Sequence, residues 1–147
     1  MKTYLIFTTG RTGSDYLNSC LDNVNNVMTF CGYFLYYEFF KNKDELILTK
    51  KLLKIFFKKY KYLFSFNRIE NIKTNVSTHK ITKFFLKNYK KKYLKRKEFL
   101  KNIYLAYHQT LKRKFTKKTV LVHHTHNQEH TKEFLKDFPN TKIFITI

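Results

Sequence analysis

A short segment near the N-terminus combines the residue types that bind an anionic group. Glycines permit a tight turn, and a helix N-terminus offers unpaired N–H groups with a partial positive charge. Arg11 adds a full charge, and the hydroxyls of Thr12 and Ser14 add donors. The segment therefore predicts a phosphate or sulfate site, although an ordinary strand-to-helix turn could contain the same residues. In full, it reads Gly10-Arg11-Thr12-Gly13-Ser14.

The residues next to this loop limit what it can be. No Lys follows Gly13, so the loop is not a Walker A motif, and a P-loop kinase is disfavoured. Asp15 comes directly after Ser14, and a carboxylate in contact with a bound anion costs about 1–4 kcal/mol. A helix N-terminus favours an acid, so we expect Asp15 to cap the helix that follows.

Histidines gather in the last third of the chain. They follow a predicted strand at its carboxyl end, the edge where open α/β sheets bind ligands. No Cys or acid completes a recognised zinc spacing with them, so we expect no metal. His126 is a candidate base or substrate-binding residue, and purely structural histidines are the alternative. The group consists of His123, His124, His126 and His130.

The elements that must position these residues alternate between strand and helix. Thr3–Thr8 is a β-prone apolar run, and Tyr16-Leu17 and Cys20-Leu21 then recur at helical spacing. Such alternation indicates a three-layer α/β fold with a mainly parallel sheet and a P-loop-type strand–loop–helix start. Further strands are predicted at 27–30, 119–122 and 142–147, and a helix at 128–137.

The last predicted strand, Lys142–Ile147, is apolar, and we expect it to be buried. The chain ends inside it, which is unusual for a buried strand and suggests a C-terminal truncation. No internal repeat and no Pro/Gly linker divides the sequence. We therefore expect residues 1–147 to form one partial domain.

The middle of the chain, about residues 41–118, reads as a basic helical insertion. Helices are predicted after Asp44, after Ser77 or Thr78, and from about Glu98, with a loop over 62–75. Residues 39–118 hold 25 Lys and Arg against four acids, and the whole chain carries a net charge of +20. Solvated lysines on helix faces or a polyanion-binding surface would both explain this charge. Only four basic residues are Arg, which weakens the second explanation.

Composition excludes several classes of protein. The hydrophobic content of 43% argues against intrinsic disorder, and two cysteines are too few for a disulfide scaffold. No apolar run approaches the roughly 18 residues of a membrane span. We expect a soluble, cytoplasmic protein with reduced thiols.

At the phosphate-binding loop the sequence resembles a known family. Tyr4-Leu5-Ile6-Phe7, the loop and Leu17 together resemble the 5′-phosphosulfate loop of sulfotransferases that use 3′-phosphoadenosine 5′-phosphosulfate (PAPS), in the bacterial and Golgi-type branch. The C-terminal part is also similar to that family. There the last strand leads into an Arg-Asp-Pro turn that binds the 3′-phosphate, and this chain stops just before it. The C-terminal resemblance lies in 120–122, 125–127, 137–140 and 143–147.

The resemblance implies a reaction and roles for residues. PAPS would be the co-substrate, without a metal, and the sulfuryl group would pass to a hydroxyl or amine of a carbohydrate, lipid or small metabolite. Residues from Gly10 to Tyr16 would hold the phosphosulfate, and Arg11 would also stabilise charge on the bridging oxygen. Glu38, in the aromatic run Tyr36-Tyr37-Glu38-Phe39, matches the family's base, with His126 as second candidate. A surface Glu paired with a lysine is the alternative for Glu38.

Two other interpretations stay open. Without the 3′-phosphate motif the chain would be inactive alone, or a complementing C-terminal chain would complete its site. The rival from another class is a basic protein that binds nucleic acid or another polyanion through the Lys- and aromatic-rich helices of 41–118.

Overall fold

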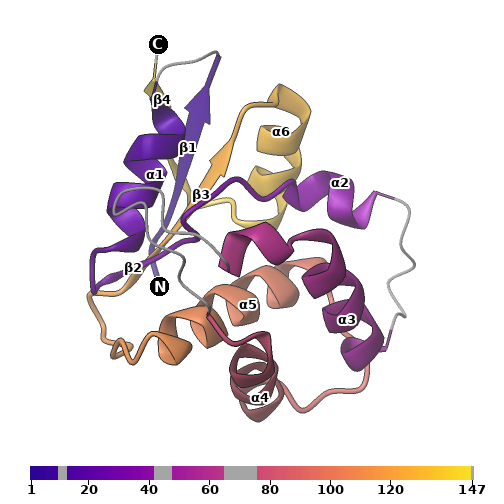
Figure 1. Cartoon of the computed structure of the whole chain (residues 1–147). Coiled ribbons are helices and arrows are strands. Elements are labelled where there is room, and N and C mark those ends of the chain that lie inside the picture. Colours follow the sequence, from indigo (N-terminus) through magenta and orange to yellow (C-terminus); the bar gives the residue numbers. More distant parts are fainter. Residues whose placement is uncertain (10–12, 42–47, 65–75, 147) are drawn as a thin grey trace.

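The computed structural model describes residues 1–9, 13–41, 48–64 and 76–146. Its centre is a four-stranded sheet in which every neighbouring pair of strands is parallel, in the order β2-β3-β1-β4 (Figure 1). This confirms the predicted α/β fold with a mainly parallel sheet. The strands are β1 (Thr3–Thr8), β2 (Val27–Met28), β3 (Val120–Thr125) and β4 (Lys142–Thr146).

The helices agree with the predicted ones where local signals were strong. Helix α6 spans the predicted residues, and Ser77 caps α4 by accepting a hydrogen bond from the Lys80 amide at 3.3 Å. The predicted cap Asp44 lies outside the described residues, and α3 begins at Thr49. The helices are α1 (Ser14–Asp22), α2 (Tyr36–Phe40), α3 (Thr49–Lys59), a 3₁₀ turn (Lys61–Phe64), α4 (Thr78–Asn88), α5 (Arg96–Thr110) and α6 (Gln128–Asp137).

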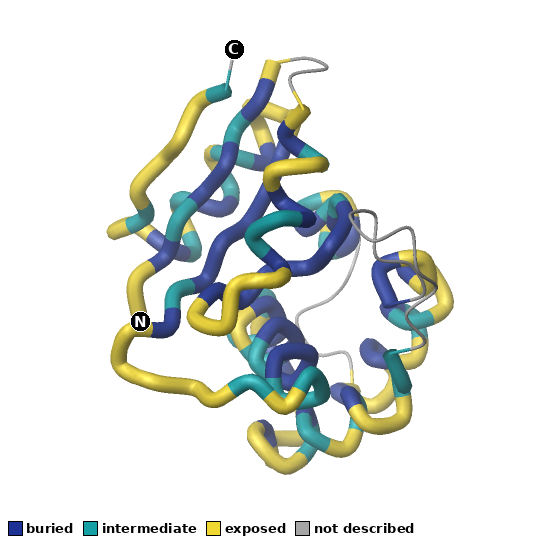
Figure 2. Tube along the Cα trace, turned by 60° about the vertical axis from the view of Figure 1, so that its left-hand side comes forward, coloured by how far each residue is buried: buried dark blue, intermediate teal, exposed yellow. Residues whose placement is uncertain are grey.

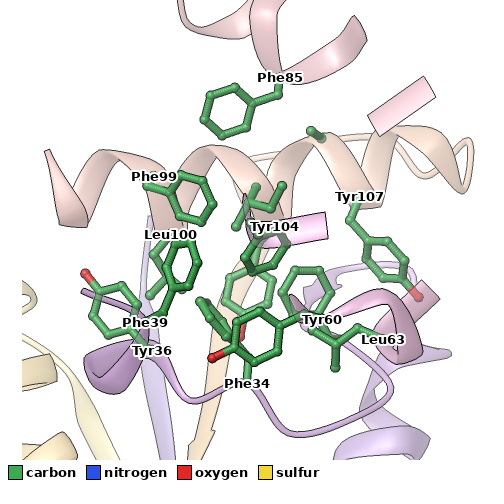
Figure 3. Packing of buried hydrophobic residues seen from close by; sticks show 14 of the residues in the cluster. Phe34, Tyr36, Phe39, Tyr60, Leu63, Phe85, Phe99, Leu100, Tyr104 and Tyr107 are labelled. Carbon is green, nitrogen blue, oxygen red and sulfur yellow. The ribbon is translucent and has the colours of Figure 1, made fainter. Parts of the chain in front are cut away.

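The alternation of side chains along β1 and β3 creates two different faces. Leu5 and Leu121 point into a large core shared with α2 to α6. Figure 3 shows how aromatic side chains fill this core, where Phe39 packs against Phe99 of α5. Their neighbours Ile6 and Val122 belong to a much smaller cluster on the opposite face, where α1 lies.

Helix α1 turns its polar side toward the protein. Asn18 and Ser19 are buried, whereas Tyr16 is 65% exposed. The Asn18 side-chain amide donates to the Phe30 carbonyl at 2.7 Å, and the Ser19 hydroxyl donates to the Cys31 carbonyl at 2.7 Å. These bonds supply partners for buried main-chain carbonyls in the connection after β2. Polar contacts therefore fix the helix that begins at the predicted anion-binding loop.

The prediction that the last strand, β4, is buried is wrong. It was expected to be buried, but Ile143, Phe144 and Ile145 are all exposed. The reason is its position: β4 is the outermost strand and pairs with β1 on one side (Figure 1). In Figure 2 the segment that leads to the C-terminus is correspondingly coloured as exposed.

The basic helices present their charge to solvent. The described lysines of the middle segment are all exposed, which both interpretations of the charge predict. Across the described ranges, no helix has both the length and the apolar character needed to cross a membrane. The exposed lysines of the helices are Lys50, Lys51, Lys54, Lys58 and Lys59 of α3, Lys80, Lys83 and Lys87 of α4, and Lys97 and Lys101 of α5.

Candidate functional site

The candidate site lies where β1 and β3 end and α1 begins. Both strands run parallel in the middle of the sheet, so their carboxyl ends meet at one edge. Gly10, Arg11 and Thr12, the first three residues of the predicted loop, lie outside the described residues. The described part of the site begins at Gly13.

Gly13 has the backbone conformation that the predicted tight turn requires. It is the N-cap of α1, with φ +73° and ψ 10°, in the left-handed region that favours glycine. Its carbonyl accepts the first helical hydrogen bond, from the Leu17 amide at 3.0 Å. Ser14 follows as a buried residue, and the side chain of Tyr16 points to solvent.

The position of Asp15 differs from the prediction. It was expected to cap the helix, but Gly13 holds the N-cap position and Asp15 lies in the first turn. A negative charge still interacts favourably with the helix dipole there. The Asp15 carboxylate faces β3, and its Oδ1 lies 3.5 Å from Nδ1 of His124. The residue directly after the predicted loop therefore meets the predicted histidine cluster.

The histidines of β3 divide between the two faces of the sheet. His123 lies in the large core, where its ring stacks on Phe134 and its Nδ1 is 2.9 Å from the Tyr104 hydroxyl. Burial, together with the nearby His124 and His130, lowers the pKa of His123 to about 3. His123 is thus a neutral structural residue, in line with the structural interpretation.

His124 and His126 lie two residues apart along the strand direction and so share the α1 side. Their ring centroids are 4.5 Å apart, and the Tyr33 ring packs edge-on against both. His124 is 2% exposed, whereas His126 is exposed. The pKa of His124 is lowered to about 4, mainly by burial and also by His126, whereas Asp15 acts to raise it. At neutral pH the His124 imidazole is therefore uncharged.

Among the described residues, Asp15, His124 and His126 form a compact group of potential metal ligands. One ligand atom from each lies within 4.8 Å of the other two. The histidine spacing alone suggested no zinc site, because the acid that completes the group comes from the other end of the chain. Only the fold, which places the start of α1 beside the end of β3, brings them together.

Glu38, the first candidate base, has a different set of neighbours. It lies on α2, and its side chain is 42% exposed. Its Oε1 is 3.4 Å from Nε2 of the buried His130 and 3.9 Å from Nζ of Lys41. The alternative of a surface Glu near a lysine therefore describes part of its environment, and the contact with His130 of α6 was not predicted.

Two arginines have structural roles. Arg96 holds Asp137 with two hydrogen bonds, of 2.7 and 3.0 Å, and the Tyr36 hydroxyl donates to the same carboxylate at 2.6 Å. Arg113 donates to Asp22 at 3.2 Å, which ties α1 to the end of α5. These guanidinium groups are occupied by carboxylates, so neither is available to grip a phosphate.

The site combines groups suited to an anion and to proton transfer. A helix N-terminus, the neutral imidazole of His124 and the Asp15 carboxylate meet at one edge of the sheet, and the Glu38 carboxylate contacts His130 of α6. The chain matches no protein-family model, no curated protein and no solved structure.

Proposed function

We propose that this chain is a sulfotransferase-like protein that binds the phosphosulfate end of PAPS at the carboxyl edge of β1. The observation that carries the proposal is the β1–α1 unit. A central strand of a parallel sheet leads to a glycine with φ +73°, and a helix begins at the next residue. This is the arrangement in which main-chain amides and the helix dipole hold an oxyanion.

The roles that we propose in the reaction are those that the family resemblance implies. The amides at the start of α1 and the Arg11 guanidinium hold the oxyanion and stabilise charge on the phosphate oxygen that leaves the sulfuryl group. The acceptor is a hydroxyl or amine, and Glu38 removes its proton. Two features support Glu38: its carboxylate is exposed and so accessible, and His130, 3.4 Å away, orients it.

Calorimetric titration with adenosine 5′-phosphosulfate tests the proposal. This probe carries the same 5′ end as PAPS but no 3′-phosphate, so it reports on the loop alone. We expect saturable binding at one site, lost in Arg11→Ala and retained in Lys87→Ala. The control removes the same charge from an exposed position on α4. Equal affinity in both variants, or no binding by the unaltered chain, would overturn the proposal.

Polyanion binding by the basic helices is the competing function, supported by their exposed lysines. The described arginines argue against it, because Arg96 and Arg113 are both paired with carboxylates. Titration with single-stranded DNA at increasing salt separates the two functions. Tight binding that falls steeply with salt and is unchanged by Arg11→Ala would favour the basic helices.

A further inference from the structure

We propose that Asp15, His124 and His126 form a binding site for a divalent first-row transition metal, with zinc as the ion that fits the donors best. This site adjoins the proposed phosphosulfate site and shares Asp15 with it, but the observations that support it do not depend on that function. It also departs from the expectation of a metal-free protein. Two observations support it: the convergence of three ligand side chains, and the buried His124 ring, whose nitrogens make no hydrogen bond within the described residues.

The convergence is close enough for one ion. The ligand atoms lie within 4.8 Å of one another. With zinc–nitrogen and zinc–oxygen bonds of about 2.0–2.2 Å, the ligand atoms of a tetrahedral ion are roughly 3.4 Å apart. Closing this difference needs a combined shift of about 1–1.5 Å, which rotation of the exposed His126 and the half-buried Asp15 can supply.

His124 is the second, independent observation. It is 2% exposed, yet neither of its ring nitrogens makes a hydrogen bond in the described part of the chain. Its Nδ1 is 3.5 Å from the Asp15 carboxylate, too far for a strong hydrogen bond. A buried imidazole lone pair without a partner is uncommon, and a metal ion would satisfy it.

The surroundings hold the ligands in place. His124 belongs to a central strand, and the Tyr33 ring packs against both histidines at centroid distances of 5.5 and 4.8 Å. Asp15 is held by α1, whose inner side is bonded to the connection after β2. Two of the three ligands thus come from a strand and a helix, which position them more firmly than a loop would, and His126 follows directly after the strand.

The donor set selects the class of ion. Imidazole favours zinc, copper, iron and nickel, and two histidines with one carboxylate match catalytic zinc sites. Three protein ligands leave the fourth position for water or an anion. The ion would also offset the charge of Asp15, which otherwise repels an oxyanion at the start of α1. The site would thus assist anion binding at the same edge.

Titration of the full chain with Co²⁺, a coloured substitute for Zn²⁺, tests the site without nucleotide or activity. We expect one equivalent of Co²⁺ to produce visible d–d absorption bands of a four- or five-coordinate ion, and Zn²⁺ to remove them by competition. Asp15→Asn and His126→Gln should each lower the affinity for Co²⁺ by at least about 10–100-fold. Both residues are partly or fully exposed, so the variants should fold.

Matched controls make the result specific. Glu98→Gln on α5 removes one carboxylate charge, and His79→Gln removes one exposed imidazole from α4. Both should bind Co²⁺ like the unaltered chain, and circular dichroism should show that controls and site variants fold equally. Equal loss of affinity in controls and site variants would show scattered surface binding and overturn the proposal. So would the absence of saturable binding by the unaltered chain.

Discussion

On the face covered by α2 to α6, the sheet packs against a continuous core of aromatic side chains, whereas on the α1 face only a small apolar cluster is buried. The first face includes Phe56, which is fully buried and contacts rings from several helices. On the second face, Leu17 of α1 and Phe144 of β4 line an open apolar groove. Buried polar residues of α1 make the contacts there instead.

This contrast separates two tasks. The aromatic face supplies most of the buried apolar area and hence most of the folding free energy. The α1 face positions the candidate site by hydrogen bonds, each of which contributes far less than a buried ring. Substitutions on the two faces should therefore differ in size and in kind.

The largest effect is expected from Phe56→Ala in the aromatic core. Removing a fully buried Phe should lower the free energy of unfolding by about 3–5 kcal/mol. Phe144→Ala is the matched control, because Phe144 is 55% exposed and, within the described ranges, its ring contacts only that of Tyr4. It should cost less than about 1 kcal/mol. Urea denaturation measures both, and similar losses would contradict the contrast between the faces.

A smaller effect is expected on the inner side of α1. Asn18→Leu leaves the Phe30 carbonyl and the Thr29 hydroxyl without a buried partner, which should cost about 1–3 kcal/mol. Leu17→Gln, on the exposed side of the same helix, should change stability by less than about 0.5 kcal/mol. If the polar substitution at Leu17 were the more damaging of the two, polar contacts would not be what holds α1.

Gly13→Ala tests the turn itself. An added Cβ would meet no described atom within 4 Å, so the cost is that of the left-handed backbone alone, about 1–2 kcal/mol. Gly13→Asn should cost less, because Asn tolerates this conformation better. Thermal unfolding of the two variants gives the comparison. A fully stable Gly13→Ala protein would show that this turn has another conformation.

The smallest effects are expected in the pH dependence of stability, with opposite signs on the two faces. Glu133 of α6 has its pKa lowered from 4.5 by Lys136 and Arg96, so its contribution is present above pH 4.5 and is lost as the pH falls. Burial raises the pKa of Asp22 of α1 above 3.8, so stability is lost as the pH rises from 3.8 toward the raised value.

The measurement is the unfolding free energy of the unaltered chain minus that of Glu133→Gln or Asp22→Asn, followed from pH 3 to 6. With increasing pH the difference for Glu133→Gln should rise and the difference for Asp22→Asn should fall. Slopes of the same sign would contradict the assigned environments of these two carboxylates.

Local signals predicted the elements well. Ser77 and the residues of α6 carry their own capping and periodicity signals, and both were predicted correctly. The burial of β4 was predicted wrongly, because an apolar strand looks the same at the centre and at the edge of a sheet. For α1, the spacing of Tyr16 and Leu17 indicated a helix but not which side faces inward, since that depends on carbonyls after β2.

The candidate site was only partly predictable, because local sequence does not contain the contacts between distant segments. The loop and the histidines could be recognised, because each is a run of neighbouring residues. The approach of Asp15 to His124, and of Glu38 to His130, joins segments that lie far apart in the sequence. Such contacts depend on strand order and on the packing of α2 against α6, which no local pattern contains.

The most direct test of the central claim is a titration of the ¹⁵N-labelled chain with adenosine 5′-phosphosulfate, followed by NMR of the backbone amides. The account predicts that the largest saturable shifts fall on Gly13, Ser14 and Asp15 at the start of α1. Shifts concentrated instead on the lysine-bearing surfaces of α3, α4 and α5 would contradict it.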